Sequence, residues 1–204
     1  MTKAAIRGID LLLALLAVVV LSPVLALVAL FIWLSDGRPV LFRQTRTGQD
    51  ERPFDILKFR TLKSHSVEGD RSFFGSRFLR RTSLDELPQL FNIIKGDMSF
   101  VGPRPLLPEY GAYYSDEERV RFSVKPGLTG LAQISGRSLL SWDEKLAADV
   151  KFVEGYSIRS YLRVLLRTPL VVASGRGATS SWDAESRLDD ERSKAGLRSG
   201  EQRA

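Results

Sequence analysis

The sequence predicts a helix-rich α+β protein in which an apolar N-terminal helix precedes a compact basic domain. Residues Leu11 to Leu34 are almost all apolar, whereas the rest of the 204-residue chain is polar and basic. Two short alternating segments then indicate a β-hairpin, and longer segments have helical periodicity. We expect a membrane helix over 1–35, a compact domain over 36–175 and a poorly ordered tail over 176–204.

Composition limits the chemistry that the chain can perform. The net charge of +6 favours an anionic partner such as phospholipid, nucleotide phosphate or nucleic acid. The chain has no cysteine and one histidine, His65, which excludes disulfides, cysteine zinc sites and thiol nucleophiles. Any catalysis must therefore use carboxylates and other oxygen ligands.

The apolar run is long enough to cross a bilayer, since about 24 residues at about 1.5 Å each reach about 36 Å. Pro23 interrupts it by removing one helical hydrogen bond, and the Ser22 hydroxyl can bond to the carbonyl that is freed. Asp10, near its start, is expected at the membrane interface, paired with Arg7 or with a later basic residue.

Basic residues flank the apolar run on both sides, although lysine and arginine favour the cytoplasmic side of a membrane. Two interpretations fit this pattern. In one, a re-entrant helix breaks at Ser22 and Pro23 and returns to the face that it entered. In the other, an ordinary proline-kinked helix spans the bilayer.

The remaining elements follow from local patterns. A hairpin is predicted from Val40 to Arg60, with Lys58 and Arg60 projecting from its end, and a loop from Ser64 to Ser76. Short helices are expected at Phe78–Arg81 and from Ser83 to Gly96, and amphipathic helices at Trp142–Val153 and Ser157–Val172. Three arginines four residues apart suit the last helix to a membrane surface, and equally to an ordinary protein surface: Arg159, Arg163 and Arg167.

The adjacent acids Asp85 and Glu86 are the most informative pair in the chain. Ser83 and Glu86 have the spacing of a capping box, which would make the acids a structural feature of a helix start. Cations and glycine-rich turns nearby favour instead a site for a phosphate. These neighbours are Arg80, Arg81, Gly102-Pro103-Arg104-Pro105, Lys125-Pro126-Gly127-Leu128-Thr129-Gly130 and Gly136-Arg137.

The chain resembles the small monotopic phosphoglycosyl transferases of the bacterial sugar transferase family, in the minimal form that lacks additional membrane helices. The segments that carry the resemblance cover nearly the whole chain except the tail, in the family's order. They are Ser22-Pro23, Lys58-Phe59-Arg60-Thr61, Ser83 to Leu90, Lys95 to Pro105 and Pro126 to Gln133.

The resemblance implies that sugar-1-phosphate passes from a UDP-sugar to polyprenol (undecaprenyl) phosphate through a covalent aspartyl intermediate, with release of UMP. Asp85 would be the nucleophile, and Glu86 would bind Mg²⁺. Lys58, Arg80, Arg104 and Arg137 would bind the substrate. Ser22 and Pro23 would form the re-entrant break, so that the catalytic domain, 36–175, lies on the cytoplasmic face of the bacterial inner membrane.

One other class of function fits the composition, namely a non-catalytic membrane-anchored basic module that binds anionic lipid or a partner protein. The basic stretches lack interleaved aromatic residues, so no nucleic-acid partner is expected. The expected partners are the UDP-sugar, the polyprenol phosphate and membrane phospholipid. A homodimer, or contacts with other enzymes of the pathway, remains open, as do the sugar and the length of the prenol.

Overall fold

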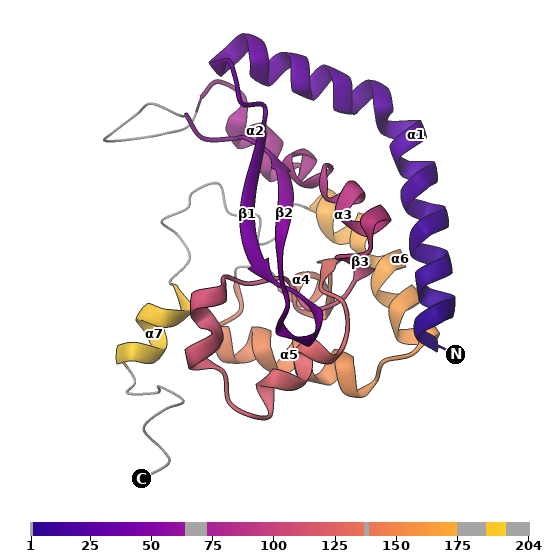
Figure 1. Cartoon of the computed structure of the whole chain (residues 1–204), viewed down its shortest axis with the longest axis vertical. Helices are drawn as coiled ribbons and strands as arrows, with labels where there is room; N and C mark the ends of the chain where they lie inside the picture. The colour runs from indigo at the N-terminus through magenta and orange to yellow at the C-terminus, as the bar shows by residue number, and fades with distance from the viewer. Residues whose placement is uncertain (1, 64–72, 137–138, 175–186, 195–204) are drawn as a thin grey trace.

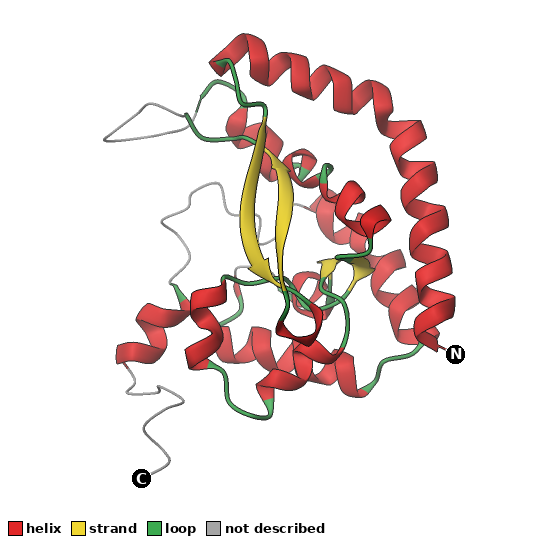
Figure 2. Cartoon of the chain, in the orientation of Figure 1, coloured by secondary structure: helices red, strands yellow, loops and turns green. Residues whose placement is uncertain are grey.

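The computed structural model describes residues 2–63, 73–136, 139–174 and 187–194. Helices surround a two-stranded hairpin and a second, shorter pair of strands (Figure 2). This arrangement confirms the predicted helix-rich α+β class. Most of the predicted loop, residues 64–72, lies outside the described residues, as do residue 175 and residues 176–186 and 195–204 of the predicted tail.

The N-terminal helix α1 (Thr2–Asp36) contains Pro23 and bends in its middle (Figure 1). Proline has no N–H, so it cannot donate to the carbonyl of Val19, four residues earlier. The Ser22 hydroxyl donates to this same carbonyl at 2.8 Å. The predicted local compensation at Ser22 is therefore confirmed, and the helix continues through the bend with that oxygen satisfied.

Both halves of α1 pack on the rest of the protein. Ile6 and Ala14 are buried before the bend, and Val28 and Ile32 are buried after it. The opposite side of the helix is apolar and exposed, at Leu12, Leu15, Leu16, Val19, Val20, Leu27, Leu30, Trp33 and Leu34. One face of the helix thus packs on the protein, and the other is an exposed apolar surface whose contact with water is unfavourable.

Polar contacts tie down the two ends of α1. Near its start, Arg7 donates to the carbonyls of Ile93 and Ile94, at the C-terminal end of α3 (Gln89–Lys95). At its end, Arg60 pairs with the carboxylate of Asp36 at 2.7 Å and donates to its carbonyl. A cation at a helix C-terminus also complements the partial negative charge there.

Asp10 lies in a different environment from the one predicted. It is buried, and its Oδ1 atom accepts hydrogen bonds from the Ser99 hydroxyl, the Phe100 N–H and the Tyr161 hydroxyl at 2.7–3.0 Å. Arg7 instead bonds to α3. Among the described residues Asp10 forms no ion pair with Arg7 or with a later basic residue, so the predicted pairing was wrong. A buried carboxylate can instead be satisfied by several neutral donors.

The predicted hairpin is confirmed. Strands β1 (Leu41–Thr47) and β2 (Pro53–Phe59) pair antiparallel, from Leu41 opposite Phe59 to Thr47 opposite Pro53, and η1 (Gln49–Glu51) lies in the turn. The other edge of β2 is covered by Asn92 of α3, which accepts from the N–H of Leu57 and donates to the carbonyl of Asp55. This side chain fixes the hairpin on the helix and protects the strand edge.

A short parallel pair, β3 (Ser99–Val101) and β4 (Gly127–Thr129), brings two glycine-containing loops together. The N–H of Gly102 donates to Thr129, and that of Gly127 donates to Pro103, each at 2.9 Å. A Cβ atom at either glycine would collide with the backbone of the other loop. Glycine is therefore required at both positions for this close approach.

Further helices and 3₁₀ turns connect or cover these parts. They are α2 (Ser76–Arg81), η2 (Leu84–Glu86), η3 (Pro108–Tyr113), η4 (Glu118–Ser123), α4 (Leu131–Ser135), α5 (Trp142–Glu154) and α6 (Ile158–Ser174). A capping box occurs at the start of α5, where Ser141 and Glu144 bond to each other's backbone. Gly96 ends α3 with a φ of 102°, as predicted from its position.

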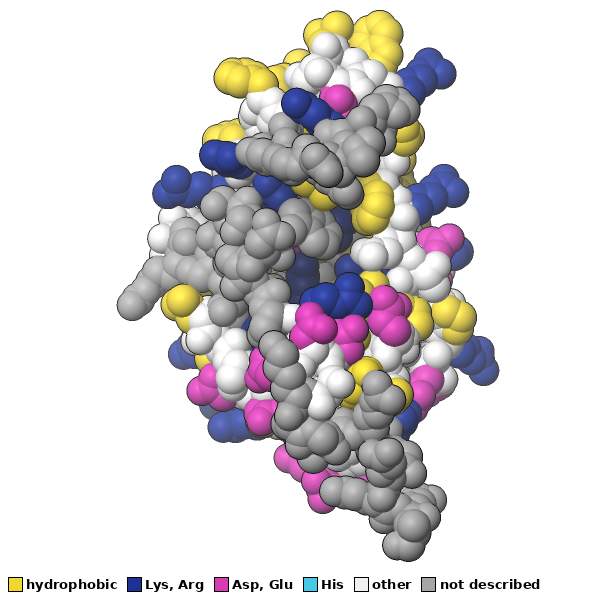
Figure 3. All heavy atoms as spheres, turned by 90° about the vertical axis from the view of Figure 1, so that its left-hand side faces the viewer, with side chains coloured by type: hydrophobic (Ala, Val, Ile, Leu, Met, Phe, Trp, Pro, Cys, Tyr) yellow, Lys and Arg dark blue, Asp and Glu magenta, His cyan; other side chains and the backbone are white. Residues whose placement is uncertain are grey.

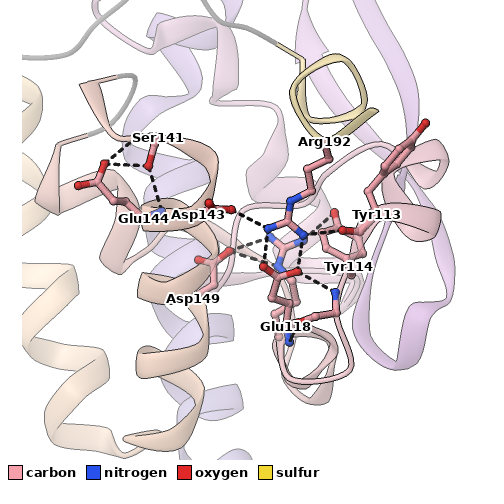
Figure 4. Close-up of polar contacts among 10 residues, drawn as sticks. Tyr113, Tyr114, Glu118, Ser141, Asp143, Glu144, Asp149 and Arg192 are labelled. Carbon is pink, nitrogen blue, oxygen red and sulfur yellow. Dashed lines mark hydrogen bonds and ion pairs between the residues drawn. The ribbon is translucent and has the colours of Figure 1, made fainter. Parts of the chain in front are cut away.

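A last helix, α7 (Leu188–Lys194), lies inside the segment whose composition predicts poor order. Leu188 is fully buried in an aromatic cluster with Tyr110, Tyr114 and Trp142. Arg192 extends between Glu118 and Asp143, bonds to both at 2.6–2.8 Å and also donates to the carbonyl of Tyr113 (Figure 4). One buried leucine and one paired arginine thus dock a polar helix on the domain.

We expect Asp10→Ala to lower the free energy of unfolding by at least about 3 kcal/mol, because three donors would lose a buried acceptor. Thermal unfolding of the detergent-solubilised protein would measure this loss. Gly8→Ala is the matched control in the same helix, since its Cβ would meet open space. Equal stability of Asp10→Ala and Gly8→Ala would contradict a structural role for the carboxylate.

Candidate active site

Asp85 and Glu86 lie in η2, a single 3₁₀ turn between α2 and α3. The capping box predicted at Ser83 is absent: Ser83 has a left-handed backbone with φ of 59°, and its side chain makes no capping bond. The Glu86 side chain turns away from Ser83 toward two cations. Tertiary electrostatics therefore override the local capping signal in this turn.

Glu86 is the point at which three separate segments meet. A single carboxylate oxygen, Oε1, accepts from Lys58 of β2 at 2.7 Å and from Arg104 of the loop after β3 at 2.9 Å. The Glu86 side chain is only 16% exposed, so solvent screens these contacts weakly. Burial alone would raise the pKa of Glu86, but Arg104 and Lys58 outweigh it and hold this pKa well below its ordinary range.

Asp85 is buried beside this cluster, and its pKa is shifted in the opposite direction to that of Glu86. Its pKa is raised from 3.8 to about 6, first by burial and then by the charge of Glu86, against the smaller effects of Lys58 and Arg104. A position at a helix N-terminus would by itself favour the ionised form of Asp85. Burial dominates instead, although a pKa of about 6 still leaves most Asp85 carboxylates ionised at pH 7.

The remaining residues that were predicted for the site do not all lie beside the acid pair. Arg80 lies in α2, and its buried Nε atom has no hydrogen-bond partner within the described part of the chain. Arg137 lies outside the described residues. Lys125 lies near Arg7, Asp10 and Asp97 and does not contribute a cation to the acid pair. Its loop instead supports the loop of Arg104 through the hydrogen bond from the N–H of Gly127 to the carbonyl of Pro103.

Two arginines near the acid pair were not predicted from the sequence. Arg46, in β1, faces Arg104 and Glu86. Arg121, in η4, is buried, pairs with Asp149 of α5 at 2.8 Å and donates to the carbonyl of Arg104 at 2.7 Å. Arg121 therefore positions the backbone of the loop from which Arg104 reaches Glu86.

The charge arrangement suits a phosphate-containing ligand with a divalent cation. Lys and Arg side chains gather in a hollow near the middle of one face, above a group of acidic side chains (Figure 3). The described residues contain no cluster of three or more acidic or histidine side chains that could enclose a metal. Two adjacent carboxylates nevertheless fit Mg²⁺, which takes one or two protein oxygens and completes its shell with water and phosphate. A cation would also relieve the repulsion that raises the pKa of Asp85.

These features define a class of protein. It has an enzyme-like site of carboxylates and cations, on a domain that is attached to a long apolar helix. The bacterial sugar transferase family model matches residues 1–175, and the chain therefore belongs to the bacterial sugar transferase family. This membership makes it an enzyme of the phosphoglycosyl transferase type, which decides against the non-catalytic module.

Three relatives illustrate the similarity. An uncharacterized sugar transferase, EpsL, of Bacillus subtilis is 41% identical, over 74% of this chain and 80% of the relative. A UDP-glucose:undecaprenyl-phosphate glucose-1-phosphate transferase of Caulobacter vibrioides is 40% identical, over 79% of this chain and 67% of the relative. An undecaprenyl-phosphate galactose phosphotransferase of Salmonella typhimurium is 31% identical, over 84% of this chain and 41% of the relative.

We expect Asp85→Asn to stabilise the protein at neutral pH, by about 1–3 kcal/mol. The folded state raises the pKa of Asp85 above its ordinary value, so ionisation costs more in the folded than in the unfolded state. This cost is absent below about pH 4 and complete above about pH 7. Thermal unfolding measured across this pH range should show a gain that grows as the pH rises.

Glu86→Gln is the matched comparison, because the lowered pKa of Glu86 predicts the opposite sign. The substitution removes the negative charge that compensates Lys58 and Arg104, and it should destabilise the protein at neutral pH. A stabilising Glu86→Gln, or a destabilising Asp85→Asn, would contradict the electrostatic description of the pair.

Proposed function

We propose that this enzyme transfers a sugar-1-phosphate from a UDP-sugar to polyprenyl phosphate, through a covalent intermediate on Asp85. The observation that carries the proposal is the division of roles in the acid pair. Lys58 and Arg104 bond to Glu86, whereas Asp85 is buried, adjacent and mostly ionised at pH 7. The names of two relatives specify glucose-1-phosphate and galactose phosphate transfer with undecaprenyl phosphate, which supports the same reaction class here.

In the first step, a carboxylate oxygen of Asp85 attacks the phosphorus that bears the sugar. A bond forms between this oxygen and phosphorus, the bond to the bridging oxygen breaks, and UMP leaves with the electron pair. In the second step, a phosphate oxygen of the polyprenyl phosphate attacks the same phosphorus. The Asp85 carboxylate is released unchanged, and the product is a polyprenyl diphosphate sugar.

The chain's own residues reduce the main obstacle to this reaction, which is the approach of a carboxylate to a negatively charged diphosphate. Glu86 would bind Mg²⁺, which supplies charge neutralisation for the phosphoryl oxygens when bound. Lys58 and Arg104 lie where they can contact phosphate oxygens as well as Glu86, and Arg80 carries a buried N–H that is free to donate. A phosphate leaving group needs no strong general acid.

We further propose that α1 is re-entrant and places the domain on the cytoplasmic face of the inner membrane. A helix that spans the bilayer would carry one half away from the domain, yet α1 is buried against the domain on both sides of Pro23. Its outer face is apolar and exposed, as one leaflet requires. The site then lies near the head groups, where a lipid phosphate is found.

Helix α6 fits the same membrane orientation. Leu162, Leu166 and Leu170 are exposed on it, among arginines spaced four residues apart. An apolar stripe beside basic residues is typical of a helix that lies on an anionic membrane surface. Phe74, Phe78 and Phe91 add further exposed apolar area, and Phe74 packs against Phe31 in the second half of α1.

We expect the purified protein, with Mg²⁺ and undecaprenyl phosphate, to release UMP from at least one member of a panel of UDP-sugars. Asp85→Asn should lower this release about a thousandfold or more, because it removes the nucleophile. Asp97→Asn, in the loop after α3, is the control and should retain activity. Without the lipid, the wild type should release UMP in a burst of at most one equivalent per enzyme molecule, as a covalent intermediate requires.

Two results would overturn parts of this proposal. Undiminished UMP release by Asp85→Asn would remove Asp85 as the nucleophile. Release that depends strictly on the lipid, without a burst, would contradict the covalent intermediate while leaving the overall transfer intact.

We expect Pro23→Ala to straighten α1 and move its C-terminal end toward the opposite face of the membrane. The chain has no cysteine, so the variants Ala5→Cys and Arg38→Cys each place a single thiol at one end of the helix. Labelling with an impermeant reagent would locate both ends, with Val20→Ala as the control for an apolar change in the same helix. Unchanged labelling in Pro23→Ala would show that Pro23 does not determine the topology.

A further inference from the structure

Arg46 lies on the same face of the hairpin as Lys58. Lys58 is opposite Phe42 in the register, and Phe42 and Arg46 are four residues apart on β1. Side chains alternate between faces, so positions two or four apart share a face, and opposite residues do as well. The two cations are therefore about 13 Å apart along one face, at a rise of about 3.3 Å per residue.

The loop that carries Arg104 lies at the Arg46 end of this row. The N–H of Thr47 donates to the carbonyl of Leu106 at 3.0 Å, which ties β1 to a residue just after Arg104. The charges of Glu86, Lys58 and Arg104 act on Asp85, whereas those of Arg104, Tyr110, Glu109 and Glu86 act on Arg46. Arg104 is therefore in the middle, with the acid pair and Lys58 at one end and Arg46 at the other.

The positive charge of Arg46 is incompletely compensated. One Nη atom donates to the amide oxygen of Gln44 at 2.6 Å, while its buried Nε has no hydrogen-bond partner among the described residues. No carboxylate forms an ion pair with it in that part of the chain. Burial, and then the neighbouring Arg104, lower the pKa of Arg46 to about 10, so it stays charged at neutral pH without a matching anion.

We propose that Arg46 binds the phosphate that leaves with the nucleoside, at the opposite end of the site from Asp85. The inference rests on the proposed function, which places the sugar-bearing phosphate at Asp85. The second phosphate of a diphosphate donor then extends along the row past Arg104 toward Arg46. An arginine with an unpaired buried N–H, held by Gln44, has its planar donors oriented before the phosphate arrives.

The experiment is direct binding of UMP to the full-length, detergent-solubilised protein, measured by calorimetry. Arg46→Gln should weaken UMP binding about 10- to 100-fold, as expected for loss of a charge-assisted contact. Arg46→Lys, which keeps the charge but loses the planar fork, should recover part of the affinity. Arg43→Gln is the matched control, because Arg43 is an exposed arginine on the opposite face of the same strand and should leave UMP binding unchanged.

Thermal unfolding without nucleotide separates binding from a structural role. Arg46→Gln removes a buried charge that is repelled by Arg104, so the melting temperature should stay equal or rise. The additional stabilisation produced by saturating UMP should be lost. A clearly lower melting temperature with unchanged UMP affinity would overturn the proposal and make Arg46 a structural residue.

A third measurement distinguishes the two phosphates that the site must bind. The KM for undecaprenyl phosphate should be the same in Arg46→Gln and Arg43→Gln. A raised lipid KM with normal UMP affinity would assign Arg46 to the lipid phosphate and overturn the proposal. Binding of UMP that depends on Arg46, in a protein that releases no UMP from any UDP-sugar, would support this inference while the proposed reaction failed.

Discussion

The rest of the site depends on one carboxylate oxygen of Glu86 that accepts from both Lys58 and Arg104. These residues belong to the hairpin, a 3₁₀ turn and the loop after β3, so the shared contact joins three segments that are distant in the chain. The two cations outweigh the effect of burial on the pKa of Glu86, whereas burial outweighs their effect on the pKa of Asp85. Burial and the charge of Glu86 therefore raise the pKa of Asp85, while the pKa of Glu86 itself is lowered.

Contacts outside the site keep these three segments in place. Asn92 anchors β2 to α3, Arg121 holds the carbonyl of Arg104, and glycines at 102 and 127 allow two loops to approach closely. Asp10 connects α1 to β3 and α6 through three hydrogen bonds. The apolar helix is therefore part of the framework that orients the site.

The elements that could be predicted from the sequence are those with local causes. The hairpin follows from alternation, the end of α3 from Gly96, and the compensation at Pro23 from the adjacent Ser22. The spacing of Ser83 and Glu86 left a capping box open as an alternative, because it is a local signal, whereas cations far away in the chain decide the orientation of Glu86. Helix α7 was missed because a single buried leucine and one paired arginine do not alter the polar composition of its segment.

The position of Arg46 relative to the site follows from the strand register and could not be predicted from the sequence alone. In the sequence it is one of several basic residues after the apolar run, but the strand pairing places it on the same face as Lys58. The free protein then holds an excess of negative charge at Asp85 and an excess of positive charge at Arg46, with Arg104 between them. Among the described residues, Lys58 and Arg104 offset the first excess only in part, and Glu109 and Glu86 offset the second only in part. A diphosphate that arrives with a divalent cation would relieve both, the cation at the acids and the phosphate at the arginines, so the instability of the empty site favours the complex with substrate.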